Sequence, residues 1–69
     1  PNPTSDLWSL NSPRIMNTIQ VFDVLGKQVM SLSPKSKNVN VDSSILRSGL
    51  YFARINTETG TQSLRLVKQ

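Results

Sequence analysis

The amino-acid sequence predicts a small all-β sandwich, because apolar and polar residues alternate along most of its 69 residues. A period of two places every second side chain on the same face, as in a half-buried strand, and the helical spacing of three to four residues is nearly absent. The alternating apolar residues are Trp8 and Leu10, Ile19 and Val21, Val39 and Val41, and Tyr51, Ala53 and Ile55. Six or seven short strands at such close spacing favour a sandwich.

Breaks in this alternation give the bounds of the expected strands. Proline, glycine and small polar residues gather at 11–13, 25–27, 33–37, 42–44, 47–49 and 58–60, where turns are expected. We therefore expect strands at residues 7–10, 18–23, 28–32, 37–41, 50–56 and 62–68, with a weaker seventh at 14–16. The only place for a helical turn is 43–47. Residues 1–69 are expected to form a single domain, because so short a chain builds one core at most.

The turn around Gly26 is expected to join two strands in a tight hairpin. Glycine can take the positive φ that such a turn requires, and Asp23 can accept hydrogen bonds from nearby backbone N–H groups. A second hairpin is expected at residues 57–61, where Gly60 suits a turn followed by a bulge.

The register of this second hairpin depends on which of two arguments is stronger. A three-residue loop would set Ile55 opposite Ser63 and Phe52 opposite Leu66. Matching of apolar residues instead sets Ala53 opposite Leu64 and Tyr51 opposite Leu66. A shift of one residue exchanges the two faces of a strand, and burial is the larger energy. We therefore expect the second register.

The side chains that most enzymes use are missing from this sequence. The chain has no cysteine and no histidine, so it lacks thiolates, the usual general base and the commonest metal ligand. Its acidic residues lie in or beside expected turns, where a carboxylate usually accepts backbone hydrogen bonds. These residues are Asp6, Asp23, Asp42 and Glu58. We expect no enzymatic activity, no metal and no cofactor.

The positive net charge does not by itself indicate a nucleic-acid-binding protein. Eight basic and four acidic residues give a net charge of +4. Phe52, Arg54 and Arg65 could form an aromatic platform flanked by guanidinium groups. The basic residues are nevertheless scattered, and only Lys35 and Lys37 lie close together in a loop. We expect no nucleic-acid partner, and no stretch approaches the roughly 20 apolar residues of a membrane span.

The first three residues are expected to form a stiff segment. Pro1 and Pro3 fix φ and remove hydrogen-bond donors, and Asn2 is pushed toward the extended region because it precedes a proline. A stiff segment of this kind keeps a preceding domain clear of the first strand. The segment has neither the basic nor the apolar region of a signal peptide, so the sequence is expected to come from the middle of a longer chain, cut at a linker.

Four motifs in order give this chain a resemblance to a known family. They are Pro1-Asn2-Pro3-Thr4-Ser5-Asp6 before Trp8 and Leu10, Ile19 to Lys27 (IQVFDVLGK), Leu46-Arg47-Ser48-Gly49-Leu50-Tyr51, and the terminal Arg65-Leu66-Val67-Lys68. In this order and spacing, the chain resembles the type A C-terminal sorting domain of the type IX secretion system over essentially its whole length.

The resemblance implies a seven-stranded immunoglobulin-like antiparallel β-sandwich at the C-terminus of a secreted Bacteroidetes-type protein. Such a domain follows a covalently attached N-terminal passenger and directs it from the periplasm through the outer-membrane type IX translocon. The passenger is then secreted or held at the cell surface, where a sortase-like peptidase usually removes the domain. These implied partners are the translocon, the peptidase and the passenger.

The resemblance also implies which residues serve as sorting motifs. Pro1, Asn2 and Pro3 match the first motif, Gly49 and Tyr51 match a glycine–tyrosine motif, and Lys68 matches the terminal basic position. The chain departs from the family's pattern in a short segment at 11–17, and in Arg65, where lysine is commoner.

Two interpretations of these motif residues stay open at this point. Gly49 and Tyr51 are either read by the secretion machinery or needed for folding, and either role gives the same sequence. Tyr51 is expected in the core near Leu66, with Lys68 exposed. The alternative function is a β-sandwich module that binds carbohydrate or protein at the end of a secreted enzyme. The scarcity of aromatic residues, one Trp, one Tyr and two Phe, favours the sorting signal over a carbohydrate module.

Overall fold

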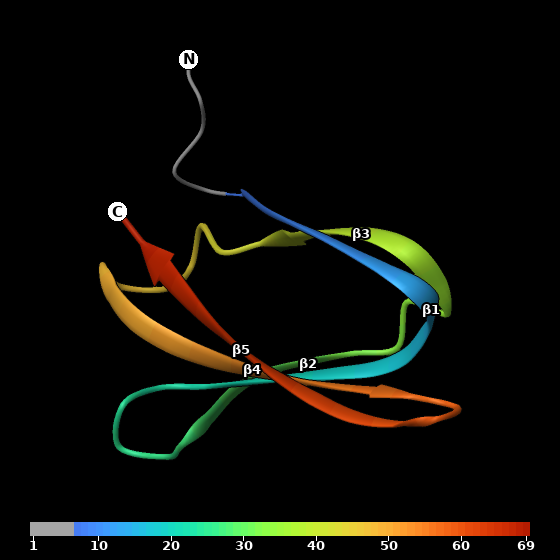
Figure 1. Cartoon of the computed structure of the whole chain (residues 1–69). Helices are drawn as coiled ribbons and strands as arrows, with labels where there is room; N and C mark the ends of the chain where they lie inside the picture. The colour runs from blue at the N-terminus through green and yellow to red at the C-terminus, as the bar shows by residue number, and fades with distance from the viewer. Residues whose placement is uncertain (1–6) are drawn as a thin grey trace.

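A computed structural model describes residues 7–69, and these residues form five antiparallel strands and no helix (Figure 1). The strands are β1 (Leu7–Phe22), β2 (Gln28–Leu32), β3 (Ser36–Asp42), β4 (Gly49–Thr57) and β5 (Gly60–Lys68). The all-β prediction and the four later strands are confirmed. The count of seven differs, because the segments expected at 7–10, 14–16 and 18–23 are parts of the single strand β1.

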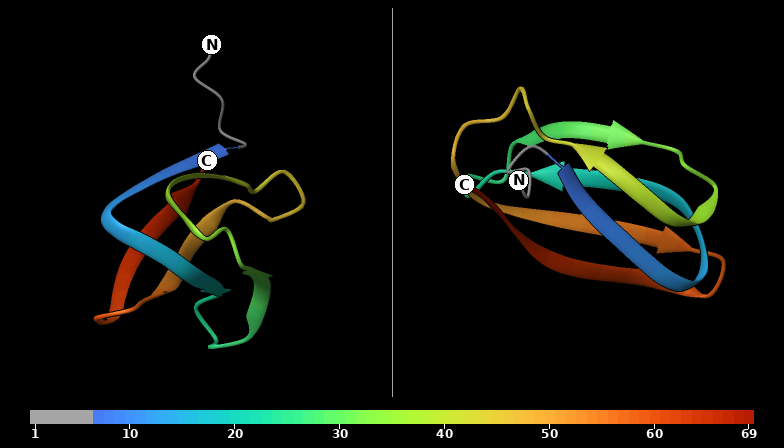
Figure 2. Two further views of the ribbon diagram at one scale, coloured as in Figure 1. Left: turned by 90° about the vertical axis from the view of Figure 1, so that its right-hand side faces the viewer. Right: turned by 90° about the horizontal axis from the view of Figure 1, so that it is seen from above.

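The long strand β1 bends and takes part in two layers. Its first half pairs with β3 from Leu7 to Asn11, and its second half pairs with β4 from Met16 to Phe22 and with β2. The left-hand view of Figure 2 shows the two halves as arms of one bent ribbon. Pro13 lies between the two paired stretches, where its missing N–H costs no ladder bond.

A bulge in β1 lets both halves of the strand face the same core. Met16 lies opposite Thr57, but Thr18 lies opposite Asn56, so one extra residue is inserted at Asn17. Such an insertion reverses which alternate side chains point inward. Leu10 and Met16 therefore point to the core before the bulge, and Ile19 and Val21 point to it afterwards.

The buried core lies between the two layers. Its members come from β1, β3 and β4, and they are Trp8, Leu10, Met16, Ile19, Val21, Val41, Tyr51, Ala53 and Ile55. The strand order β2-β1-β4-β5 makes β1 and β4 the inner strands of the larger layer, while β3, within the part of the chain that the structure describes, pairs with β1 alone. β4 is accordingly the strand with the clearest alternation of buried and exposed residues.

The two predicted hairpins form as turns of different kinds. Gly26 has a φ of +85°, and the Asp23 Oδ1 atom accepts the backbone N–H groups of Leu25 at 2.9 Å and Lys27 at 3.0 Å. Both parts of that prediction are confirmed. The second hairpin has the register set by apolar matching, but the expected bulge is wrong, because Thr57 pairs directly with Gly60 across a two-residue loop.

The expected helical turn at 43–47 is replaced by a tight turn between β3 and β4. The backbone N–H of Leu46 donates to the Ser43 carbonyl at 2.9 Å, which closes one turn without continuing into a helix. The Asp42 Oδ1 atom accepts the N–H of Ser44 at 2.9 Å. Side-chain bonds of this kind compete with helix formation and favour turns.

Truncation of Ile19 should destabilise the domain far more than truncation of Ile15. Ile19 is fully buried where β1 pairs on both sides, so Ile19→Ala should cost about 2–5 kcal/mol in the free energy of unfolding. Ile15 on the same strand is 43% exposed, and Ile15→Ala should cost about 0.5 kcal/mol or less. Urea unfolding of the two variants measures the difference, and equal losses would contradict the two-layer core.

Candidate functional site

Strand pairing brings Gly49, Tyr51 and Lys68, which were predicted to be sorting-motif residues, to one end of the molecule. Gly49 lies directly opposite Lys68, and Tyr51 lies opposite Leu66 on the same pair of strands. A hydrogen bond from Trp8 to the Val67 carbonyl brings the beginning of β1 to the end of β5. Two further residues contribute contacts there. We call Trp8, Asp42, Gly49, Tyr51 and Lys68 the terminal cluster.

Pro1, Asn2 and Pro3 lie outside the described residues. Their role as a sorting motif therefore stays a prediction.

Tyr51 is the centre of the terminal cluster. Its side chain is 7% exposed, and its hydroxyl donates a 2.8 Å hydrogen bond to the Arg47 carbonyl. The bond joins β4 to the loop that precedes it, in the manner of the tyrosine that fixes a strand corner in immunoglobulin domains. The ring also packs against Trp8, with centroids 5.8 Å apart and a tilt of 56°. Its expected place in the core beside Leu66 is confirmed.

Gly49 starts β4 with a backbone conformation that favours glycine. Its φ is +147°, outside the range that residues with a Cβ commonly adopt. A Cβ added there would meet no atom within 4 Å. The need for glycine therefore comes from the backbone and not from close contact with a neighbour.

Trp8 fastens the last strand to the first. Its indole Nε1 donates a 2.9 Å hydrogen bond to the Val67 carbonyl, across 59 positions of the sequence. Among residues 7–69, β5 is the outermost strand of its layer and pairs only with β4, so this bond is a second attachment for its end. Trp8 was not predicted to be a site residue. Its position beside the motif at residues 1–6 was the one sequence feature that could have identified it.

Lys68 is buried, and the expectation that it is exposed is wrong. Only 6% of the residue is exposed. In the register that apolar matching selects, Lys68 falls on the same side of β5 as Leu66 and faces the core. The long aliphatic part of a lysine can lie along apolar surface while its ammonium group reaches a polar partner. Lys68 takes part in a further interaction within the fold, and its positive charge acts on Asp42.

Asp42 supplies a negative charge near this lysine. The backbone N–H and the side-chain hydroxyl of Ser44, together with the positive charge of Lys68, hold the pKa of the Asp42 carboxyl below its ordinary value. Burial opposes this shift only in part. The carboxylate is therefore the favoured form, and it links the β3–β4 turn electrostatically to the end of β5. Asp42 was predicted to accept a backbone hydrogen bond in a turn, which is confirmed. Its position near Lys68 was not predicted.

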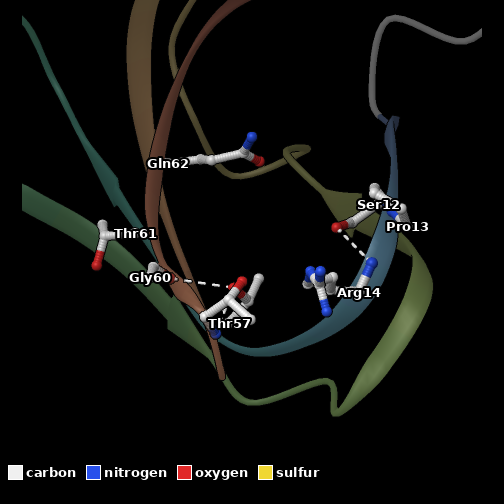
Figure 3. A pocket seen from close by; sticks show the side chains of 8 residues that line it. Ser12, Pro13, Arg14, Thr57, Gly60, Thr61 and Gln62 are labelled. Atoms are coloured by element: carbon white, nitrogen blue, oxygen red, sulfur yellow. Dashed lines mark hydrogen bonds between the residues drawn. The ribbon is translucent and has the colours of Figure 1, made fainter.

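A polar hollow of about 200 Å³ lies between the bend of β1 and the β4–β5 hairpin (Figure 3). Ser12, Pro13 and Arg14 lie on one side of it, and Thr57 and Gln62 lie on the other. Two of these hydroxyls already have partners, since Ser12 accepts the N–H of Arg14 and Thr57 donates to the Gly60 carbonyl. The lining has no carboxylate and no histidine, so it offers no acid–base pair for catalysis.

The described residues offer neither a metal site nor a membrane span. No group of three His, Cys, Asp or Glu lies together among residues 7–69. Within that same range, no helix is long and apolar enough to cross a membrane. The terminal cluster joins the first strand, the β3–β4 turn and the last strand, and its contacts stabilise the fold.

Removal of the Tyr51 hydroxyl should weaken the corner between the β3–β4 loop and β4. Tyr51→Phe should cost about 1 kcal/mol in the free energy of unfolding, because the Arg47 carbonyl loses its donor. Tyr51→Ala also removes the ring and should cost about 3–5 kcal/mol. Chemical denaturation followed by tryptophan fluorescence measures both, since Trp8 contacts the ring. A Tyr51→Phe variant as stable as the parent would contradict the importance of this bond.

Acid should weaken the domain partly through Asp42. A carboxyl whose pKa is lowered by folding stabilises the fold above its unfolded value of 3.8, and this contribution is lost as the pH falls through the lower folded value. Melting temperatures measured from about pH 6 to about pH 2 should therefore fall less steeply in Asp42→Asn than in the parent. Glu58→Gln, in the exposed β4–β5 loop, is the control. Identical acid profiles for Asp42→Asn and the parent would refute the assignment.

Comparison with known proteins gives one match, and it covers the chain from end to end. Residues 1–69 match the family described as the secretion system C-terminal sorting domain. No curated protein and no solved structure matched the chain. The matched range contains every motif that suggested the resemblance and every residue of the terminal cluster. The chain therefore belongs to the family of type IX secretion C-terminal sorting domains, which mark proteins for secretion or for export to the cell surface.

Proposed function

We propose that this domain is a non-enzymatic sorting signal that directs an N-terminal passenger from the periplasm through the outer-membrane type IX translocon. The observation that carries the proposal is the family match over all 69 residues. Residues 1–69 act as one domain, and a sortase-like peptidase at the cell surface separates it from the passenger. The domain contributes recognition, and the chemistry of removal belongs to the peptidase.

We also infer that the machinery reads the assembled end of the domain and not separate side chains. Tyr51 and Lys68 are 7% and 6% exposed, so little of either side chain can be touched while the domain is folded. Their contacts instead hold β4, β5 and the β3–β4 turn in place. The motif residues are then the residues that build the shape, and the burial of Tyr51 and Lys68 supports this interpretation over direct reading of their side chains.

The two-layer arrangement is consistent with a reduced immunoglobulin-like sandwich. The Tyr51 corner and the antiparallel pairing support this relationship. A carbohydrate-binding module receives less support, because Trp8 and Tyr51 are buried and Phe52 is the exposed aromatic residue among the four of the chain. Carbohydrate modules are expected to present several exposed rings.

Fusion of this domain to an inert passenger should direct that passenger to the medium or the cell surface. The passenger carries its own N-terminal signal peptide, and the host is a Bacteroidetes strain with a working type IX system. Removal of residues 65–69 takes away the Val67 carbonyl that Trp8 binds and the buried Lys68, so the passenger should stay in the periplasm. Cell fractionation and surface proteolysis with immunoblotting measure its location. Unchanged export of the truncated fusion would rule out the sorting function.

Substitution of Lys68 tests, in the same export assay, whether the machinery recognises the charge of Lys68 or the folded shape of this end of the domain. Lys68→Met keeps most of the buried side-chain volume and removes the ammonium group, and Lys37→Met removes an exposed lysine as the matched control. If the machinery recognises the folded shape of this end, Lys68→Met should be exported less well only to the extent that its lowered melting temperature shows a loss of folded domain. Loss of export at an unchanged melting temperature would show that the ammonium group itself is read.

A further inference from the structure

The outer face of β4 and its neighbours carries a row of aromatic and basic residues. Phe22 on β1 lies opposite Phe52 on β4, and Phe52 in turn lies opposite Arg65 on β5. Phe52 is 41% exposed, and its neighbours along β4, Tyr51 and Ala53, are buried on the other side of the sheet. This face is therefore separate from the core and from the side chain of Tyr51.

A second arginine is held over this row. The guanidinium carbon of Arg54 lies 5.5 Å from the centroid of the Phe22 ring, a cation–π distance. Arg54 is exposed, so its charge stays accessible while its position is restricted. We call Phe22, Phe52, Arg54 and Arg65 the aromatic–arginine face.

The β1–β2 turn extends the apolar part of this face. A hollow of about 390 Å³ is lined by Phe22, Phe52 and Arg54 together with Val24 of the turn. Val24 and the adjoining Leu25 are 63% and 90% exposed. The turn geometry depends on Asp23 and Gly26, as the hydrogen bonds and the positive φ show. Neither exposed apolar side chain is therefore needed to form the turn.

The charges of this face have one sign. β4 and β5 contain no aspartate or glutamate, and both of their exposed arginines belong to the face. Asp23 lies at its rim, and the Oδ1 atom of that carboxylate already accepts two backbone N–H groups. A surface that fits the face must therefore supply the negative charge.

Composition favours a protein as the partner. The centres of protein interfaces are enriched in aromatic residues and arginine and depleted in lysine, glutamate and aspartate, which matches this face. Single-stranded nucleic acid stacks its bases on successive open rings, but Arg54 lies over the Phe22 ring and Phe52 is the more accessible ring. A second copy related by a two-fold axis would bring arginines against arginines.

We propose that the aromatic–arginine face is a docking surface for a protein that presents carboxylates around an apolar centre. The face lies on the outer side of the sheet, and its use does not depend on how the end of the domain is read. The terminal cluster and the aromatic–arginine face are then two separate binding determinants on opposite sides of β4.

Site-specific cross-linking tests this docking surface. The chain has no cysteine, so Ser63→Cys, exposed beside Arg54 on the hollow, gives a single attachment site for a benzophenone-maleimide. Ser9→Cys, exposed on the half of β1 that belongs to the other layer, is the matched control. The labelled passenger fusion, with a cysteine-free passenger, is irradiated with a detergent extract of the host cell envelope. Position 63 should give a protein adduct whose cross-linked peptide contains aspartate or glutamate, and position 9 should not.

Charge reversal decides whether the face itself makes the contact. Arg54→Glu with Arg65→Glu should lower the adduct yield at least about tenfold, because like charges would then meet across the interface. Lys35→Glu with Lys37→Glu changes the net charge equally at two exposed positions, in the β2–β3 loop and at the start of β3, and should leave the yield unchanged. Arg54→Gln with Arg65→Gln replaces the reversal variant if circular dichroism shows that the latter is unfolded.

Several results would overturn the proposal. Two of them concern the yield: no adduct forms at position 63, or the arginine variants leave the yield unchanged. Three concern the identity of the adduct: the contact peptide contains no acidic residue, the partner is a second copy of the domain, or nuclease removes the adduct. Export of the unmodified fusion is scored in parallel. A fusion that is not exported but still gives the arginine-dependent adduct would refute the sorting function and leave the docking surface standing.

Discussion

The bend of β1 is the constraint on which the rest of this structure depends. One strand supplies the partner of β3 through its first half and the partner of β2 and β4 through its second half. Because both layers share this strand, neither can form its complete hydrogen-bonded ladder without the other. A domain of 69 residues buries little surface, so a covalent connection between its layers is an economical way to align them.

The second consequence of the bend is the closure of the terminal end. The first half of β1 carries Trp8 to the last strand, where its indole bonds to the Val67 carbonyl. The ring of Tyr51 packs against Trp8, and its hydroxyl holds the loop before β4. The end of the chain is thus fixed by contacts to three separate segments. These contacts form only when β1, β4, β5 and the β3–β4 turn are all in place.

Alternation along β4 allows one strand to serve two purposes. Tyr51, Ala53 and Ile55 point inward and stabilise the core, while Phe52 and Arg54 are exposed on the other face. Substitutions on one face of such a strand need not disturb the other. The domain can therefore keep its folded shape while its outer face is adapted to a partner, and a small chain gains two functional surfaces from one sheet.

The features that the sequence alone determined depend on interactions between residues that are close in sequence or paired across one short hairpin. Period-two alternation predicted the strands, Asp23 and Gly26 predicted the first turn, and apolar matching selected the register of β4 and β5. The family could also be inferred from the order of the motifs. Each of these inferences uses neighbours in sequence or residues paired across one short hairpin, where few alternatives compete.

Only the tertiary structure decided the continuity of β1 and the composition of the terminal cluster. The bulge at Asn17 and the bend near Pro13 depend on which strands pack on each half of β1, and a turn-like sequence there suggested separate strands instead. The burial of Lys68 follows from the register of β4 and β5, but lysine is usually exposed, so the residue type alone favoured an exposed side chain. The bond from Trp8 to Val67 spans 59 positions, and no local pattern encodes a contact between residues that meet only after both layers have formed.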